Sequence, residues 1–192
     1  MRIIAGRFGS RPLLAPAGLA TRPTTDRLRE TLFNVLAPRI RGASFLDLYS
    51  GSGAVGIEAL SRGAAHVVFV ERAPAALKIL RANLASLGIA EAIQIRASGV
   101  AQFLRRPPSA PSKAQPAPFN LVFLDPPYDA AQEYAAALTL LGGAASTLLA
   151  PHAQVIAEHR RKHPLEEHYA ALTRTRLLEQ GDAALSFFEL VR

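Results

Sequence analysis

Short apolar runs alternate with helix-like segments through the middle of the chain. The runs at residues 44–49, 66–70, 93–96, 120–124 and 154–157 are typical of buried strands. Segments with helical spacing or helix-end signals follow the first four runs, at residues 54–61, 74–87, 100–104 and 130–141. Because strands that are apolar throughout are buried on both faces, this order predicts an α/β fold with a largely parallel sheet covered by helices on both sides.

Both ends of the chain depart from this alternation. Residues 2–8 and 13–14 are separated by Gly-Ser-Arg-Pro and predict a small β-hairpin arm without a core of its own. Residues 174–178 and 184–191 flank Gln-Gly-Asp and predict an antiparallel hairpin. The expected division is an arm over residues 1–20 and a main domain over residues 21–192.

A helix is expected between the arm and the first strand. Thr24 or Thr25 can cap its start after Pro23, and Pro38 and Gly42 are expected to end it. One face of this helix is apolar at helical spacing and comprises Leu28, Leu32, Val35 and Leu36.

Composition excludes several kinds of protein. A length of 192 residues with 49% hydrophobic residues suits one globular domain. The chain has no cysteine, which removes disulfides, cysteine-ligated zinc and thiol catalysis, and which fits a reducing compartment. No apolar stretch approaches about 18 residues, so we expect a soluble, cytoplasmic protein.

Residues 107–118 contain five prolines and are expected to form a surface loop.

The positive charge is concentrated near the N-terminus. The net charge is +7, and residues 1–41 hold eight arginines against only Asp26 and Glu30. Arginine forms forked contacts with phosphate and stacks on bases. This distribution indicates a nucleic-acid partner, although a solvated basic face would have the same composition.

A glycine-rich segment joins the first strand to the helix that follows it. Gly51, Gly53 and Gly56 fit the dinucleotide fingerprint, and Glu71 lies at the end of the second strand, where a carboxylate can bind ribose hydroxyls. NAD and S-adenosylmethionine both fit this pattern. Asp47 favours S-adenosylmethionine, because a carboxylate in this segment can accept from a cationic amino-acid amine.

The fourth strand ends in Asp125-Pro126-Pro127-Tyr128. The Asp125 carboxylate can accept a hydrogen bond from an NH2 group, and the prolines offer carbonyl acceptors without competing N–H donors. Tyr128 can stack on a flat base. This arrangement suits methylation of an exocyclic amine and does not suit hydride transfer, although a proline-rich turn alone can close a strand.

Several of these motifs together resemble the RsmD-type family of bacterial enzymes, which methylate the N2 of a guanine in 16S ribosomal RNA. The resemblance spans almost the whole chain. It rests on residues 1–6, on Arg-Pro-Thr-Thr-Asp-Arg-Leu-Arg-Glu-Thr-Leu-Phe-Asn at 22–34, on Leu46-Asp47 with Gly-Ser-Gly-Ala at 51–54, on residues 58–62, and on residues 125–128. Asp-Pro-Pro-Tyr also occurs in adenine-N6 methyltransferases, whereas the segment at 22–34 is more selective.

The resemblance implies a Rossmann-like class I methyltransferase fold, with a mostly parallel seven-stranded sheet, and a monomer that uses S-adenosylmethionine and no metal. It implies a small-subunit 16S rRNA substrate, with position 966 as the family's target. Ser98 occupies the place after the third strand that usually contacts adenine. The implied catalytic residues are Asp125, Pro126, Pro127 and Tyr128. The implied cofactor residues are Asp47, Tyr49, Gly51, Ser52, Gly53, Glu71, Arg72, Ser98, Asp125 and Thr24. The RNA-contacting residues are expected to be Arg2, Arg7, Arg11, Arg22 and Arg27.

Three other interpretations fit parts of the sequence. An oxidoreductase would share the glycine fingerprint. An adenine-N6 or other guanine-N2 methyltransferase would share most of the motifs. An RNA-binding assembly factor without catalysis would share the arm, but it would not need the acids at the strand ends.

The histidines His152, His159, His163 and His168 lie among basic residues without a metal-binding spacing, so no metal site is expected there.

Overall fold

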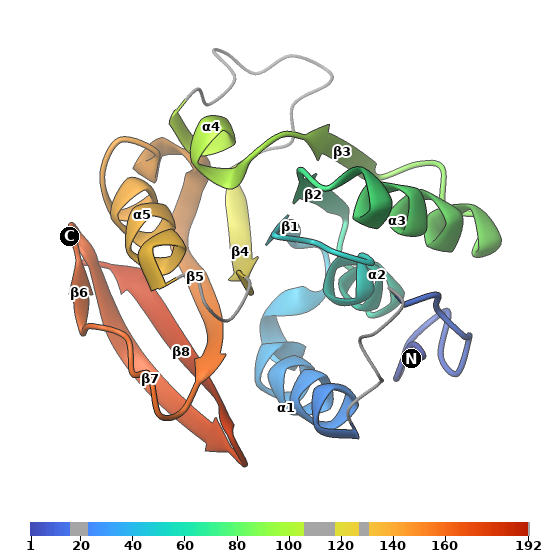
Figure 1. The fold of residues 1–192 in the computed structure, drawn as a ribbon, viewed down its shortest axis with the longest axis horizontal. Coiled ribbons are helices and arrows are strands. Elements are labelled where there is room, and N and C mark those ends of the chain that lie inside the picture. Colours follow the sequence, from blue (N-terminus) through green and yellow to red (C-terminus); the bar gives the residue numbers. More distant parts are fainter. Residues whose placement is uncertain (16–22, 106–117, 127–130, 192) are drawn as a thin grey trace.

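The computed structural model of the chain describes residues 1–15, 23–105, 118–126 and 131–191. Within these residues, a single eight-stranded sheet has the order β3-β2-β1-β4-β5-β8-β7-β6 (Figure 1). The predicted sheet had seven strands. The additional strand, β6 (His168–Tyr169), is two residues long and too short to give a sequence pattern.

Five neighbouring strands are parallel, as the alternation of elements predicts. They are β3 (Ile93–Ala97), β2 (His66–Glu71), β1 (Ser44–Leu48), β4 (Phe119–Leu124) and β5 (Leu149–Arg160). The register aligns Asp47 of β1 with Phe69 of β2 and Phe123 of β4. The carboxyl ends of these strands therefore lie at one edge, where open α/β sheets bind their ligands.

The other part of the sheet is antiparallel. β8 (Ala183–Leu190) pairs with β5 and with β7 (Leu172–Gln180), and β6 pairs with β7. This confirms the predicted C-terminal hairpin. Strand β5 is much longer than the predicted 154–157, because β8 pairs with its far end as far as Arg160.

Helices cover both faces of the sheet. One apolar cluster joins side chains of α1 (Pro23–Ile40), α2 (Ala54–Ser61) and α3 (Pro74–Ser86) to Phe45, Val67 and Phe69. A second joins α4 (Val100–Arg105) and α5 (Ala131–Gly142) to the alternate residues Leu46 and Val68. A short 3-10 helix, η1 (Ser146–Leu148), precedes β5. None of the helices in the described ranges is long and apolar enough to cross a membrane.

Helix α1 differs from the prediction at its start. It begins at Pro23, so Thr24 and Thr25 lie within the helix and do not precede it. It continues through Pro38 and ends at Ile40, between the two residues, Pro38 and Gly42, that were expected to end it. Leu36 and Ile40 are both buried in the first apolar cluster, and this packing holds the last turn in place on either side of the proline.

The N-terminal arm is simpler than the predicted hairpin. Its two limbs share one antiparallel bridge, between Arg2 and Pro12, and backbone hydrogen bonds join Ile3 to Arg11 and Ser10 to Ile3. Ile3 and Leu13 are buried in the first apolar cluster. The arm therefore packs on the main domain and shares its core (Figure 1).

Candidate functional site

The glycine loop between β1 and α2 requires its glycines for two different reasons. Gly53 has a φ of 81°, and a Cβ there would lie 2.3 Å from Leu80 Cδ1. A Cβ on Gly56 would lie 2.3 Å from Phe69 Cε1, so this glycine lets the helix pack closely on β2. Gly51 has a φ of 55° and open space beside it, with the nearest atom 4.0 Å away. Gly51 is thus the position where a ligand can approach the backbone.

Asp47 lies beneath this loop and supports it. Its side chain is 2% exposed, and its Oδ2 accepts a hydrogen bond of 2.9 Å from Gly56 N. Burial raises the pKa of the Asp47 carboxyl to about 8, and the nearby carboxylates of Asp125 and Glu71 add to the rise. The sequence predicted a contact with a cofactor amine, and the structure gives Asp47 a backbone partner in the loop itself.

Glu71 organises the end of β2 with both of its oxygens. One carboxylate oxygen accepts from Gly51 N at 2.9 Å, and the other accepts from the backbone N–H groups of Arg72 and Ala73 at 2.8 Å. Glu71 therefore lies directly against the glycine loop at Gly51. The Arg72 side chain is exposed and extends the same edge.

Asp125 directly follows β4 and is partly buried, and Pro126 next to it is buried. Burial raises the pKa of the Asp125 carboxyl to about 7. The predicted residues Pro127 and Tyr128 lie outside the described residues. The electrostatic coupling of Asp125 to Asp47 places these two acids in one neighbourhood, with Glu71 beside Asp47.

A fourth carboxyl group, which the sequence did not single out, belongs to this edge. Glu158 of β5 follows Ala157, and Ala157 pairs with Leu124 immediately before Asp125. Burial and the charge of Asp125 raise the pKa of Glu158 well above its usual value, and Arg29 opposes the rise. A single acid inside a long apolar strand gave no motif, so only the pairing of β4 with β5 identifies it.

Two of the other predicted cofactor residues, Tyr49 and Ser98, directly follow strands at the same edge. Tyr49 has a φ of 61°, and its hydroxyl donates to Glu133 Oε2 at 2.7 Å, which ties the glycine loop to α5. Burial and this hydrogen bond raise the pKa of the Tyr49 hydroxyl. Ser98 follows β3 and is partly buried. Thr24 lies in the first turn of α1.

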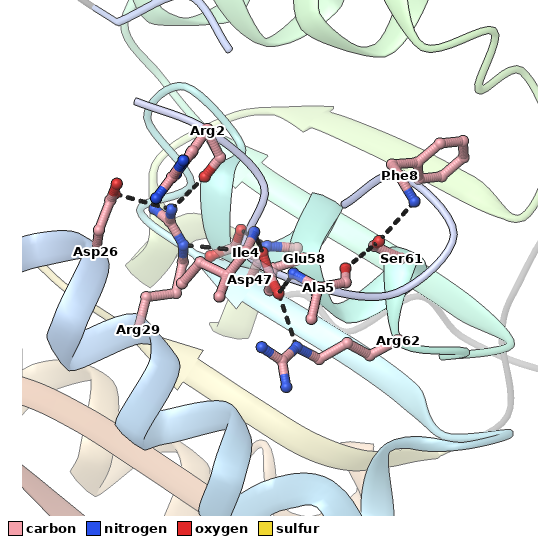
Figure 2. A network of polar contacts seen from close by, with 11 residues as sticks. Arg2, Ile4, Ala5, Phe8, Asp26, Arg29, Asp47, Glu58, Ser61 and Arg62 are labelled. Carbon is pink, nitrogen blue, oxygen red and sulfur yellow. Dashed lines mark hydrogen bonds and ion pairs between the residues drawn. The ribbon is translucent and has the colours of Figure 1, made fainter. Parts of the chain in front are cut away.

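The arm is fixed to α2 by one fully buried acid. Figure 2 shows Glu58 accepting hydrogen bonds from Ile4 N at 2.7 Å, from Ala5 N at 3.0 Å and from Arg62 Nε at 2.7 Å. Ser61 Oγ accepts from Phe8 N at 2.9 Å and donates to the Ala5 carbonyl. Residues 58–62 are part of the family pattern, but that pattern gave Glu58 no role.

The predicted RNA-contacting arginines lie on the surface where they are described. Arg2, Arg7, Arg11 and Arg27 are exposed, and Arg22 lies outside the described residues. The Arg11 guanidinium donates to the Ser86 carbonyl, and the Arg7 guanidinium lies 4.2 Å from the centre of the Phe8 ring. Arg29 is different, because it is buried and bonds to the Arg2 carbonyl and to Asp26 (Figure 2).

Two of these histidines have side-chain hydrogen-bond partners within the protein. His159 is buried, with Nε2 2.9 Å from Ser186 Oγ, and His168 Nδ1 lies 3.0 Å from Thr173 Oγ1. No group of three His, Cys, Asp or Glu side chains arranged for a metal ion occurs in the described part of the chain.

An open cavity lies at the opposite edge of the sheet. Its volume is about 260 Å³, and its lining includes Arg39, Arg41, Asn120 and His152 at the amino ends of β1 and β4. This cavity is separated from the acids and the glycine loop by the length of the strands. The candidate functional site is therefore the group of residues at the carboxyl edge, and this cavity is separate from it.

Known proteins are similar to this chain in sequence and in fold over nearly its whole length. The family model described as "Conserved hypothetical protein 95" matches residues 1–189. A Bacillus subtilis protein named "Putative rRNA methyltransferase YlbH" is 36% identical over 189 residues, which are 98% of each chain. The Haemophilus influenzae protein named "Ribosomal RNA small subunit methyltransferase D" is 38% identical over 170 residues, covering 86% of this chain and 81% of that protein. The solved structure "Putative methyltransferase yhhF from Escherichia coli" has a TM-score of 0.81 and 34% identity, covering 99% of this chain and 97% of that one.

Proposed function

The chain belongs to the family described as Conserved hypothetical protein 95, the RsmD-type family that its motifs resemble, and from this premise we propose that it methylates 16S ribosomal RNA. The proposed reaction transfers a methyl group from S-adenosylmethionine to the exocyclic N2 of one guanine in the small subunit. The fold is the Rossmann-like fold of class I methyltransferases. An rRNA substrate also supports the expected cytoplasmic location and a ribosomal particle as partner.

The electrostatics of the carboxyl edge fit a cationic cofactor. Burial raises the pKa of Asp47, and Asp125 and Glu71 lie near enough for their negative charges to raise it further. A positively charged ligand would relieve this repulsion, whereas the pyrophosphate of NAD would increase it. S-adenosylmethionine carries a sulfonium and an ammonium group. Glu71 would hold the ribose, Gly51 would allow close backbone approach, and Ser98 would lie beside the adenine.

Asp125 and Pro126 carry the proposal for the reacting amine. S-adenosylmethionine supplies an electrophilic methyl carbon, whose bond to sulfur breaks with its electron pair remaining on sulfur. The Asp125 carboxylate and the Pro126 carbonyl would accept the two N–H bonds of the guanine amine. This positioning directs the nitrogen lone pair toward the methyl carbon, and well-oriented reactants can gain on the order of 7–11 kcal/mol. The amine proton then leaves to Asp125 or to water.

The observation that carries this proposal is the position of Asp125. It is a partly buried acid immediately after β4, with an adjacent proline carbonyl, and it is electrostatically coupled to the acid beneath the glycine loop. This combination supports transfer to an exocyclic amine next to a cofactor.

The test uses small ribosomal subunits from a strain that lacks the matching enzyme. The purified protein is incubated with these particles and labelled S-adenosylmethionine, and the digested RNA is examined by mass spectrometry. We expect N2-methylguanosine at a single 16S position. Asp125→Ala should lose transfer by at least about 100-fold and leave cofactor binding largely intact, because the variant removes an acceptor for the amine but only one of several acids near the cofactor.

Other outcomes of the same experiment would overturn parts of the proposal. N6-methyladenosine would change the target base and keep the cofactor. The absence of label on particles, free rRNA and DNA would favour the RNA-binding assembly factor. Turnover by Asp125→Ala similar to that of the native protein would remove the role of Asp125.

A further inference from the structure

Asn83 on α3 is a buried amide to which neither the motifs nor the family resemblance gave a role. It is 1% exposed and belongs to α3, whereas the glycine loop leads into α2. Its Oδ1 accepts from Leu14 N at 2.8 Å. Its Nδ2 donates to the Leu14 carbonyl at 3.1 Å and to the Ser52 carbonyl at 2.9 Å. One side chain therefore contacts both the end of the arm and the middle of the glycine loop.

The contact with Ser52 gives its carbonyl a donor that α2 does not supply. Ser52 precedes Gly53, the N-cap of α2, and the first backbone bond of this helix runs from Ile57 N to the Gly53 carbonyl. Asn83 Nδ2 supplies a side-chain donor to the Ser52 carbonyl. Gly56 N, at the start of α2, donates to Asp47 Oδ2, so Asp47 and Asn83 together hold the loop and the helix start.

The contact with Leu14 joins the loop to the N-terminal arm. Glu58 and Ser61 hold residues 4–8 of the arm on α2, and Asn83 holds its other end on α3. Both backbone groups of Leu14 bond to the same amide. A displacement of the arm at Leu14 therefore pulls on the side chain that holds Ser52.

We propose that Asn83 is a positioning residue that couples RNA binding by the arm to cofactor binding by the glycine loop. The inference rests on the proposed function, which assigns the arm to rRNA and the loop to S-adenosylmethionine. It adds a route between the two ligands: arm, Leu14, Asn83 and Ser52. By linkage, each ligand then changes the affinity for the other by the same factor.

The test removes the donor of this amide. Asn83→Asp keeps the size and the oxygen that accepts from Leu14 N, but it removes the donor to both carbonyls and adds an acid at a buried position. Asn120→Asp is the control for the same substitution at an exposed position, where Asn120 Oδ1 accepts from Ser44 N at 2.9 Å at the opposite edge of the sheet. S-adenosylmethionine affinity is measured by equilibrium dialysis. The affinity for an rRNA fragment is measured with and without S-adenosylhomocysteine, and the melting temperature is recorded for each protein.

We expect Asn83→Asp to weaken cofactor binding and raise the KM for S-adenosylmethionine by about tenfold, with a smaller change in kcat. The cofactor product should strengthen RNA binding to the native protein and to Asn120→Asp, and this ratio should fall toward one in Asn83→Asp. A purely structural role would lower the melting temperature without changing the KM or the ratio, and that result would overturn the proposal.

Two further results separate this inference from the proposed function. If the native protein transfers methyl groups and Asn83→Asp matches it in KM and coupling, only the role of Asn83 is wrong. If the native protein neither binds S-adenosylmethionine nor methylates rRNA, the proposed function itself fails. Should Asn83→Asp not fold, Asn83→Ser takes its place, because its hydroxyl can donate to only one of the two carbonyls and the same loss of coupling is expected.

Discussion

At the scale of single residues, two of the acids at the carboxyl edge accept hydrogen bonds from backbone N–H groups of the protein itself. Asp47 accepts from Gly56, and Glu71 accepts from Gly51, Arg72 and Ala73. These contacts fix the carboxylates in place. The raised pKa values of Asp47 and Asp125 show mainly the cost of burying these carboxyl groups, and for Asp47 the charges of Asp125 and Glu71 add to it.

This arrangement predicts that cofactor binding depends on pH. In the free protein, the pKa is about 8 for Asp47 and about 7 for Asp125, so part of each population is protonated at neutral pH. A cationic ligand favours the carboxylate forms and lowers both values, so its binding releases protons. We expect affinity for S-adenosylmethionine to rise from pH 6 to pH 8, by at most about tenfold per pH unit for each titrating group.

Calorimetry measures this proton release directly. Titrations at pH 7 in two buffers with different ionisation enthalpies should give different heats, and the difference gives the number of protons released. Asp125→Asn should reduce that number. Equal heats in both buffers would contradict the prediction.

At the scale of elements, helix α2 connects the site to the arm. The glycine loop leads into its start, and its middle presents Glu58 to Ile4, Ala5 and Arg62 (Figure 2). Gly6 shows how close this packing is, because a Cβ there would lie 2.0 Å from the Ser61 carbonyl oxygen. The arm is therefore a packed part of the domain, even though it has few backbone pairs of its own.

Removing the Glu58 carboxylate should release the arm. Glu58→Ala leaves two backbone N–H groups and the Arg62 guanidinium without their acceptor, and we expect a loss of about 3–5 kcal/mol in the free energy of unfolding. Urea denaturation measures this loss, and hydrogen exchange at Ile4 and Ala5 should accelerate. Glu91→Ala removes an exposed acid and serves as the control. Unchanged exchange at Ile4 and Ala5 in Glu58→Ala would show that other contacts hold the arm.

Two elements show where sequence patterns are imprecise. Pro38 and Gly42 together predicted the end of α1, and burial of Leu36 and Ile40 keeps the chain helical past Pro38 as far as Ile40. Strand β5 was predicted as four residues, because its first half includes exposed Pro151 and His152 and lacks a clear apolar run. In both cases, contacts with distant residues decided what local propensity could not.

At the scale of the whole molecule, the excess of positive charge lies near the N-terminus and not in the sheet. Residues 1–41 hold eight arginines, and within the described residues Arg2, Arg7 and Arg11 on the arm and Arg27 on α1 are exposed. Exposed arginines suit contact with a large polyanion. The bulk of the remaining chain is nearly neutral and forms the sheet and its covering helices.

Replacing Arg2, Arg7 and Arg11 with glutamine should weaken RNA binding most strongly at low salt. If each arginine neutralises one phosphate, the slope of log affinity against log salt should fall in magnitude by about 2 to 3. The control replaces exposed Arg161, Lys162 and Arg176 in the antiparallel part of the molecule, with the same change in charge. Filter binding over a range of salt concentrations measures both slopes, and equal effects from both sets would indicate nonspecific attraction.

The sequence by itself determined the order of strands and helices, the parallel core and the acids at its carboxyl edge. Those features depend on apolar periodicity, on glycines and on residues that directly follow strands, all of which are local. Only the tertiary structure decided the roles of Glu58, Asn83 and Glu158. Glu58 meets Ile4 across 54 positions, and Asn83 meets Leu14 across 69. Such contacts depend on how the elements pack, and a single polar residue within a helix or strand gives no local pattern that could predict its distant partner.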